Sequence, residues 1–306
     1  MLSKEYYIDK LKREYTNQII HSICWLVGSI IFTLAILKYN FNREFYEQDP
    51  DLSYYSTNTD IVSDTNLYLI NIIPVSIIIV IIFGLSKPVE FIDSKVKEVV
   101  YIVIIYFLTI CTNILITEIL KKFFGKPRPS IYYLCNYQGF RDGIQSNNLT
   151  QYYLLTNSHN LANTDLCWDQ SALPNAVSSF PSGHTSFSFC SQTFLVVILN
   201  WLFSSFSYSV NYNIYCLSKL KFLSYIPLIL AGWISISRIY DYKHNEVDLV
   251  GGFIIGCCIG YYGSNQVIDL YKKYDLYNKL IIQENISKNE FRKIVNIYNF
   301  IENDNV

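Results

Sequence analysis

Six long, nearly uncharged apolar runs constrain the fold of this chain more than any other feature. A helix needs roughly 20 mostly apolar residues to cross the hydrocarbon core of a bilayer. The runs are Thr16–Leu37, Thr65–Ser86, Val99–Thr117, Phe187–Phe206, Phe222–Tyr240 and Leu249–Leu270. The rest of the chain holds too little polar sequence to cover six buried helices in a soluble protein. The sequence therefore predicts an all-α, polytopic membrane protein with six transmembrane helices.

The composition agrees with a membrane protein and argues against one class of partner. Of the 306 residues, 51% are hydrophobic and 16% are charged, whereas about 25% charged residues are usual in soluble domains. The formal net charge is −1, which gives no reason to expect a nucleic-acid partner. We expect membrane lipids to surround the chain, and association with further copies of itself stays open.

We divide the chain into three parts. Residues 1–15 form a charged N-terminal segment, residues 16–270 form the six-span domain with a long third loop at 118–184, and residues 271–306 form a tail. The first fifteen residues mix acidic and basic side chains, and the first apolar run lacks a clear small-residue cleavage site. We therefore interpret this run as a retained span and not as a signal peptide.

Basic residues predict how the chain is oriented in the membrane. They concentrate on the side that holds both termini and the second and fourth loops, and such a side is usually cytoplasmic. Both termini are thus expected in the cytoplasm, with the first, third and fifth loops lumenal or extracellular. A glycosylation sequon, Asn148-Leu149-Thr150, lies in the third loop and agrees with this orientation. The endoplasmic reticulum, the Golgi and the plasma membrane all fit.

Two of the eight cysteines lie in the third loop, and most of the others lie in predicted spans. Cys135 and Cys167 can form a disulfide if this loop faces an oxidising compartment. The chain has no paired Cys-x2-Cys pattern that would indicate a zinc site.

Three polar clusters lie at helix ends that the predicted topology brings to one face of the membrane. The first, residues 121–129, follows the third span, and the second, Pro181–His184, precedes the fourth. The third, Ser237–Asp248, joins the fifth and sixth spans. No span separates the first cluster from the second, and two spans separate the second from the third. Each cluster alone has an ordinary interpretation, such as cations that reach the headgroups or residues that start a helix, so their convergence is what indicates a site.

The cationic and amide groups of these clusters suit a phosphate monoester, which is a dianion. Lys121, Arg128 and Arg238 can neutralise its oxygens, the two arginines in a bidentate manner. The Ser182 hydroxyl and the Gly183 backbone N–H can donate to the same oxygens at the start of a helix.

The histidines supply the chemistry. His244 can attack phosphorus and form a phosphohistidine, and Asp248, four residues on, can orient it. His184 can protonate the leaving alcohol oxygen as a general acid. No carboxylate cluster offers Mg²⁺ a site, and the fixed cations perform its role, so no metal and no cofactor are expected.

The three clusters together resemble the signature of the type 2 phosphatidic acid phosphatase (PAP2) superfamily. The matching residues are Lys121-x6-Arg128-Pro129, Pro181-Ser182-Gly183-His184 and Ser237-Arg238-x5-His244-x3-Asp248. The six-span layout is similar to the lipid phosphate phosphatase branch. The resemblance implies a six-helix membrane fold and Mg²⁺-independent hydrolysis of lipid phosphates such as phosphatidate, lysophosphatidate or sphingosine 1-phosphate. It also implies the residue roles given above.

Two positions depart from that branch. Its members often have Gly-Arg-Leu-Arg-Pro in the first motif, where this chain has Gly125-Lys126-Pro127-Arg128-Pro129, and a second histidine where this chain has Asn245. A polyprenyl (dolichyl) diphosphatase and a diacylglycerol pyrophosphate phosphatase share the same site chemistry and stay open as alternatives. A catalytically inactive signalling or transport protein on the same scaffold would have lost the histidines or the cations, and all of them are present here.

Overall fold

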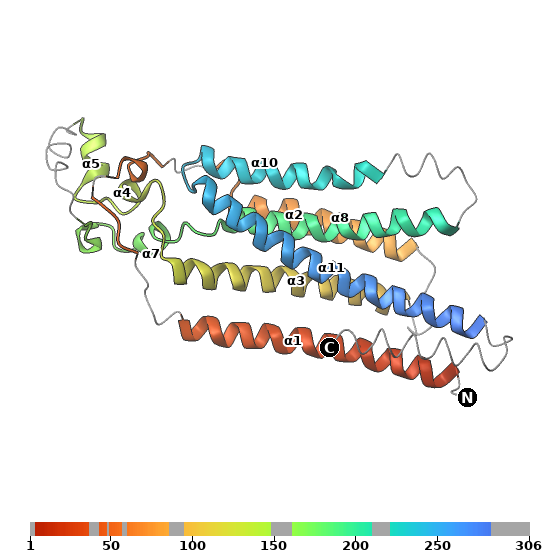
Figure 1. The fold of residues 1–306 in the computed structure, drawn as a ribbon. Helices are drawn as coiled ribbons and strands as arrows, with labels where there is room; N and C mark the ends of the chain where they lie inside the picture. The colour runs from red at the N-terminus through yellow and green to blue at the C-terminus, as the bar shows by residue number, and fades with distance from the viewer. Residues whose placement is uncertain are drawn as a thin grey trace.

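A computed structural model describes residues 4–36, 43–47, 49–56, 60–85, 95–147, 161–209 and 221–282. The long elements are α-helices (Figure 1). They are α1 (Lys4–Ile36), α2 (Asp64–Leu85), α3 (Lys95–Phe124), α8 (Gly183–Ser209), α10 (Ile226–Tyr240) and α11 (Glu246–Ile282). Short helices occupy the connections, namely η1 (Pro50–Leu52), α4 (Ile131–Leu134), α5 (Phe140–Gln145), η2 (Thr164–Leu166), α7 (Leu173–Ala176) and η3 (Lys221–Tyr225).

Five helical stretches among the described residues are long and apolar enough to cross a membrane. They are Asp64–Gly84, Glu98–Phe124, Gly183–Ser204, Lys221–Tyr240 and Glu246–Lys273. These stretches correspond to the second to sixth predicted spans. The first predicted span lies within α1, a helix of 33 residues, so the six-span arrangement stays a prediction.

Several helices extend beyond the apolar runs that predicted them. α3 continues to Phe124, so Lys121 lies in its last turn, and the third connection begins at Gly125, later than predicted. α11 continues to Ile282 into the predicted tail, and α1 already begins at Lys4. These extensions contain no glycine or proline, so nothing in them interrupts a helix. Hydropathy marks the part of a helix that meets lipid, whereas the helix itself ends where a residue such as Gly125, with φ of 51°, turns the backbone.

α8 lies at the centre of the bundle. It packs against α2, α3, α10 and α11 (Figure 1). Its apolar stretch is 56% buried within the protein, compared with 28–39% for the other four stretches. Other helices therefore surround α8, including the residues at the N-terminus of α8.

Glycines let α11 approach α8 unusually closely. Gly252, Gly256 and Gly260 recur every fourth residue and so share one face of α11. A Cβ atom on Gly256 would lie 2.4 Å from the Ser186 carbonyl oxygen, and one on Gly260 would lie 2.4 Å from that of Cys190. Because no side chain fits there, the two backbones are in direct contact, as small residues allow between membrane helices.

The connection between α3 and α8 folds into a compact cap at one end of the bundle (Figure 1). The buried core of the cap consists of Ile131, Tyr132, Tyr133, Cys135, Tyr137, Phe140, Cys167 and Ala176, with Phe45 and Leu52 from the connection before α2. Cys135 and Cys167 are joined by a disulfide, with their Cα atoms 5.1 Å apart. The sequon at Asn148 lies outside the described residues.

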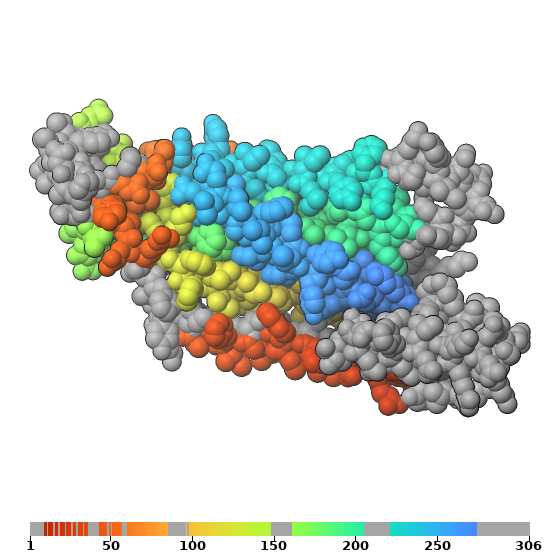
Figure 2. All heavy atoms as spheres, viewed as in Figure 1, coloured from red at the N-terminus to blue at the C-terminus, as the bar shows by residue number. Residues whose placement is uncertain are grey.

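The outer faces of α10 and α11 carry large exposed apolar side chains. They include Ile229, Ile236, Val250, Phe253 and Ile254. Figure 2 shows α10 and α11 covering much of one face of the molecule. Apolar surface of this extent is rare on soluble monomers and is expected where helices contact lipid.

The disulfide predicts a measurable contribution to the stability of the cap. Replacing both Cys135 and Cys167 by alanine removes a link across a sequence separation of 32 residues. By restricting the unfolded chain, such a link raises the free energy of unfolding by about 4 kcal/mol. We expect a lower melting temperature for the double variant in detergent. The same change at Cys258, an exposed thiol on α11, should leave the melting temperature near that of the parent. Equal melting temperatures for all three proteins would contradict the prediction.

Candidate active site

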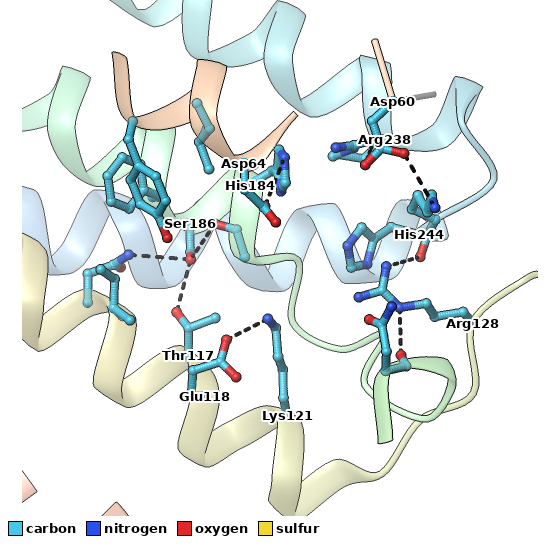
Figure 3. A pocket seen from close by; sticks show the side chains of 18 residues that line it. Asp60, Asp64, Thr117, Glu118, Lys121, Arg128, His184, Ser186, Arg238 and His244 are labelled. Atoms are coloured by element: carbon cyan, nitrogen blue, oxygen red, sulfur yellow. Dashed lines mark hydrogen bonds and ion pairs between the residues drawn. The ribbon is translucent and has the colours of Figure 1, made fainter. Parts of the chain in front are cut away.

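A cavity of about 310 Å³ lies between α2, α3, α8 and the turn from α10 to α11 (Figure 3). Charged and titratable side chains make up much of its lining: Lys121, Arg128, Arg238, Lys243, Asp60, Asp64, Glu118, His184 and His244. All three sequence clusters thus contribute to one cavity, as the even number of spans between them predicts.

A backbone carbonyl orients the imidazole of His244. The side chain is 4% exposed, and its Nδ1 lies 2.7 Å from the Ser179 carbonyl oxygen. Because a carbonyl only accepts, Nδ1 carries the proton, and Nε2 of the neutral ring then holds the free lone pair. Asp248 Oδ2 lies 3.7 Å from Nδ1, which is an ion-pair distance and too long for a hydrogen bond. Ser179 therefore sets the tautomer, and Asp248 contributes negative charge.

Asp248 is itself fully buried and fully bonded. Its Oδ1 accepts a hydrogen bond from Lys126 Nζ at 2.7 Å, and its Oδ2 accepts from Ser179 Oγ at 2.5 Å and from the Asn245 backbone N–H at 3.0 Å. Such partners offset the desolvation of a buried carboxylate. Neither Lys126 nor Ser179 was among the residues that the three motifs predicted for the site. The one signal was a cation at position 126, where the branch often has arginine.

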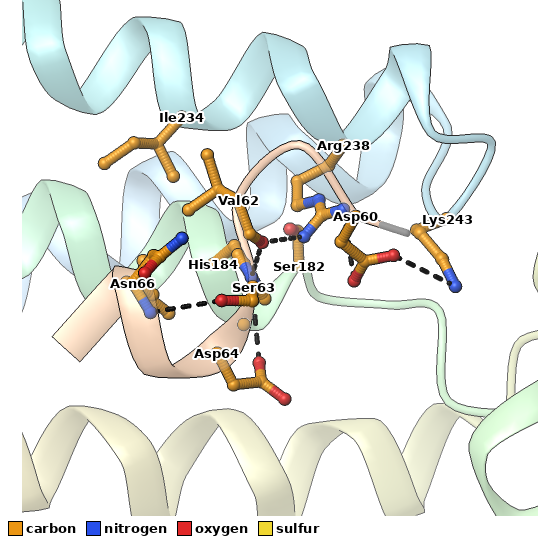
Figure 4. Close-up of polar contacts among 12 residues, drawn as sticks. Asp60, Val62, Ser63, Asp64, Asn66, Ser182, His184, Ile234, Arg238 and Lys243 are labelled. Atoms are coloured by element: carbon orange, nitrogen blue, oxygen red, sulfur yellow. Dashed lines mark hydrogen bonds and ion pairs between the residues drawn. The ribbon is translucent and has the colours of Figure 1, made fainter. Parts of the chain in front are cut away.

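His184 is held by the connection that precedes α2. Its Nε2 lies 3.0 Å from the Val62 carbonyl oxygen and 3.7 Å from Asp64 Oδ1. The same carbonyl accepts a hydrogen bond from Arg238 NH1 at 2.9 Å (Figure 4). One backbone oxygen therefore joins the second and third motifs. No sequence motif marks this contact, and the acidic residues just before the second span are its one indication in the sequence.

Arg238 is almost completely buried and is rigidly held. Its NH2 group bonds to Asp241 and lies 3.5 Å from Asp60. Its Nε has no hydrogen-bond partner among the residues that the structure describes, although the side chain lines the cavity. A buried N–H without a partner is uncommon, so this atom is available to bind an acceptor in the cavity.

Arg128 is anchored by the cap. Its Nε donates to the Asn175 carbonyl oxygen at 2.8 Å, which directs the guanidinium to the cavity that it lines. Burial, followed by the repulsion of Arg238, lowers the pKa of Arg128 to about 10. The group therefore stays cationic at neutral pH.

Lys121 and the start of α8 are in contact. Lys121 Nζ binds Glu118 Oε1 at 2.6 Å, and a Cβ atom on Gly183 would lie 3.1 Å from that same ammonium. Gly183 thus gives the lysine room beside the helix N-terminus, which favours anions.

Ser182 lies beside the cavity and is not part of its lining. Its side chain is buried. Its Oγ accepts a hydrogen bond from Thr185 Oγ1 at 3.1 Å, and its backbone N–H donates to the Asp248 carbonyl oxygen at 3.0 Å. Ser182 therefore links α8 to α11 behind the cavity wall, next to the residues that face the cavity.

Burial also determines the charge of His244. It lowers the pKa of the imidazole to about 3; Arg128 and Lys121 act in the same direction, and Asp248 opposes them. The ring is consequently neutral at pH 7, with its Nε2 lone pair unprotonated.

Comparisons with known proteins agree with the three motifs. A family model described as the PAP2 superfamily matches residues 102–271. The chain is 29% identical over 168 residues to "Probable diacylglycerol pyrophosphate phosphatase 1" of Schizosaccharomyces pombe, which covers 55% of this chain and 53% of that protein. It is 28% identical over 184 residues to "Lipid phosphate phosphatase 2" of Arabidopsis thaliana (60% and 56%). It is 26% identical over 247 residues to "Lipid phosphate phosphatase 1" of the same plant (78% and 65%).

The chain spans about half to two thirds of the length of these relatives. No solved structure matches it.

The burial of His244 predicts a pH dependence of stability, whatever the cavity binds. The pKa is about 3 in the folded protein and about 6.5 in the unfolded chain, so the unfolded state binds more protons between these values. The stability from the neutral ring is therefore present above pH 6.5 and is lost as the pH falls towards 3, by roughly 2 kcal/mol at pH 5.

Melting temperatures at pH 7 and pH 5 test this expectation. The decrease on acidification should be smaller for His244→Gln than for the parent. The same substitution at His21, which is exposed on α1, should keep the full decrease. The same decrease in His244→Gln as in the parent would show that the ring is not held neutral by burial.

Proposed function

The chain belongs to the PAP2 superfamily, and on that premise we propose that it is a lipid phosphate phosphatase that hydrolyses phosphate monoesters through a phosphohistidine intermediate. One observation supports this most directly. Two histidines and three cations from all three motifs face one cavity at the end of the membrane helices. A lipid's phosphate can occupy this position while its chains stay in the bilayer.

The phosphate end of the cavity has the donors that a dianion needs. Arg238 offers its Nε, which has no partner among the described residues, and Arg128 and Lys121 add two more cations to the lining of the same cavity (Figure 3). Charge-assisted bonds of this kind are the strong ones, and they need no reorganisation during the reaction. Because the chain fixes these cations in place, we propose that hydrolysis needs no Mg²⁺.

The reaction then has two steps. His184 enters the reaction in its protonated form. His244 Nε2 attacks phosphorus, the bond from phosphorus to the ester oxygen breaks, and the protonated His184 donates its proton to the departing alcohol. The imidazole becomes cationic in this step, and the Ser179 carbonyl and Asp248 stabilise its Nδ1–H. Water then attacks the phosphohistidine, His184 takes a proton from that water, and phosphate leaves with His244 restored. We assign Ser182 a supporting role behind the site and Gly183 a place beside the phosphate.

We further propose the full six-span arrangement, with α1 as the first span, both termini cytoplasmic and the cavity at the lumenal or extracellular end. A diacylglycerol pyrophosphate phosphatase is the second candidate, because the matched S. pombe protein has that name. The same residues would then cleave the terminal phosphate of a diphosphate.

Phosphate release from a lipid panel tests the proposal. The panel contains phosphatidate, lysophosphatidate, sphingosine 1-phosphate, diacylglycerol pyrophosphate and dolichyl diphosphate in detergent micelles with EDTA. The parent should hydrolyse at least one monoester, and His244→Ala should lose about a thousandfold or more of that activity because it removes the nucleophile. His21→Ala, on an exposed face of α1, should behave as the parent. Activity that requires Mg²⁺, or that persists without His244, would refute the mechanism.

Two neighbouring lysines give a matched test of phosphate binding. Lys121 lines the cavity, and Lys122 is not among its lining residues. Lys121→Met removes a donor and leaves Glu118 facing the phosphate without its partner, so kcat/KM should fall by about 100-fold or more. Lys122→Met should stay within about twofold, as surface changes usually do. Equal losses in both variants would mean that the lysines act through the helix end in general.

A further inference from the structure

The cavity extends beyond the residues that the mechanism uses. Tyr68 of α2, Asn113, Thr117 and Glu118 of α3, and Ser186 of α8 also line it. In Figure 3, Thr117 and Ser186 lie beyond Lys121 on the side away from His244. This second end therefore adjoins the place where the leaving alcohol of a bound phosphate ester would extend.

The hydrogen bonds of the second end fix the orientation of the Asn113 amide. Ser186 Oγ lies 2.9 Å from Thr117 Oγ1 and 3.2 Å from the Gly183 carbonyl oxygen. The single hydroxyl proton of Ser186 is used in one of these contacts, so its oxygen can only accept from Asn113. Asn113 Nδ2 donates to it at 3.4 Å, which leaves Oδ1 as the amide atom that can meet a ligand.

Asn113 Oδ1 is a buried acceptor without a donor among the residues that the structure describes. The side chain is 0% exposed and lines the cavity, and within the described part of the chain no group donates to Oδ1. Such atoms are rare in folded proteins because leaving them unpaired is destabilising. The effect is stronger inside a membrane-spanning helix, where lipid supplies no donor. The atom thus points to a donor that arrives with the substrate.

We propose a donor subsite, meaning a place in the cavity that binds a hydrogen-bond donor of the substrate. It consists of Asn113, Thr117, Glu118 and Ser186, and it binds a hydroxyl or an ammonium carried by the lipid next to its phosphoester. The inference rests on the proposed function and narrows its substrate class. Lysophosphatidate has a free hydroxyl at this place, and sphingosine 1-phosphate has an ammonium. Phosphatidate has esters on both positions and only accepts hydrogen bonds, so it leaves Asn113 Oδ1 unpaired.

Carboxylates at the same end favour the ammonium. Glu118 lies 2.6 Å from Lys121 in the free protein, and a phosphate bound to Lys121 competes for that ammonium. The Glu118 carboxylate is then free to pair with a cation on the substrate. Asp64, near His184, adds a second negative group to the lining. We therefore expect the ammonium lipid to be hydrolysed faster than the hydroxyl lipid, and both faster than the fully esterified one.

A matched substrate pair tests the donor subsite in the parent protein. The pair is lysophosphatidate and its 2-deoxy analogue, with equal chains, in mixed micelles with EDTA, and sphingosine 1-phosphate and phosphatidate form two further arms. The kcat/KM for lysophosphatidate should exceed that for the deoxy analogue by at least about tenfold, because the analogue leaves a buried acceptor unpaired. Equal values across the four lipids would overturn the inference and leave the phosphatase function intact. Hydrolysis of none of them would overturn the proposed function and this inference with it.

Variants test whether the Asn113 side-chain amide causes the preference for lysophosphatidate over its deoxy analogue. Asn113→Leu should bring the ratio between lysophosphatidate and its deoxy analogue close to one. Asn71→Leu is the control, because Asn71 is equally buried but its Nδ2 binds the Leu67 carbonyl oxygen and its Oδ1 accepts from Gln192. It should keep the parent's ratio. The ratio compares two substrates in one preparation, so partial loss of folded protein cancels, and an unchanged ratio in Asn113→Leu would refute the subsite.

Discussion

The direct contact between the backbones of α8 and α11 is the constraint on which the site depends. Gly256 and Gly260 bring α11 against the carbonyl oxygens of α8, and the Ser182 N–H then donates to the Asp248 carbonyl oxygen at the end of the same interface. A helix pair with larger residues would be held several ångströms farther apart. His184, at the start of α8, and His244, just before α11, would then no longer face one cavity.

The buried charges of the site are paired with one another, whereas two of its polar atoms have no partner among the described residues. Arg238 is balanced by Asp241 and Asp248 by Lys126, so the buried charges are compensated before any ligand binds. The Arg238 Nε donor and the Asn113 Oδ1 acceptor have no partner among the described residues, and their side chains line the same cavity. A molecule that complements both atoms has an acceptor group at one end and a donor beside it. A phosphate ester next to a hydroxyl or ammonium has this pattern.

The sequence was sufficient to predict the second to sixth spans and the convergence of the motifs, because hydropathy marks membrane helices and span parity places their ends. It could not show the contacts that orient the site. The Val62 and Ser179 carbonyls hold the two histidines, and any residue type supplies a carbonyl, so no pattern reveals them. The motif likewise does not show that Ser182 Oγ accepts a hydrogen bond from Thr185 Oγ1 within the first turn of α8.

The geometry around His244 reconciles two requirements of a histidine nucleophile. The resting ring must be neutral, and burial together with Arg128 keeps it so. The ring must also tolerate a positive charge once phosphorus is attached, and for this Asp248 lies 3.7 Å from Nδ1. A direct hydrogen bond from Nδ1–H to that carboxylate would favour the cation before attack, whereas the neutral Ser179 carbonyl fixes the same tautomer without doing so. Lys126, at 2.7 Å from Asp248, further weakens the electrostatic effect of the Asp248 carboxylate on the neutral ring. We infer that the carboxylate acts mainly after attack, when the cation has formed.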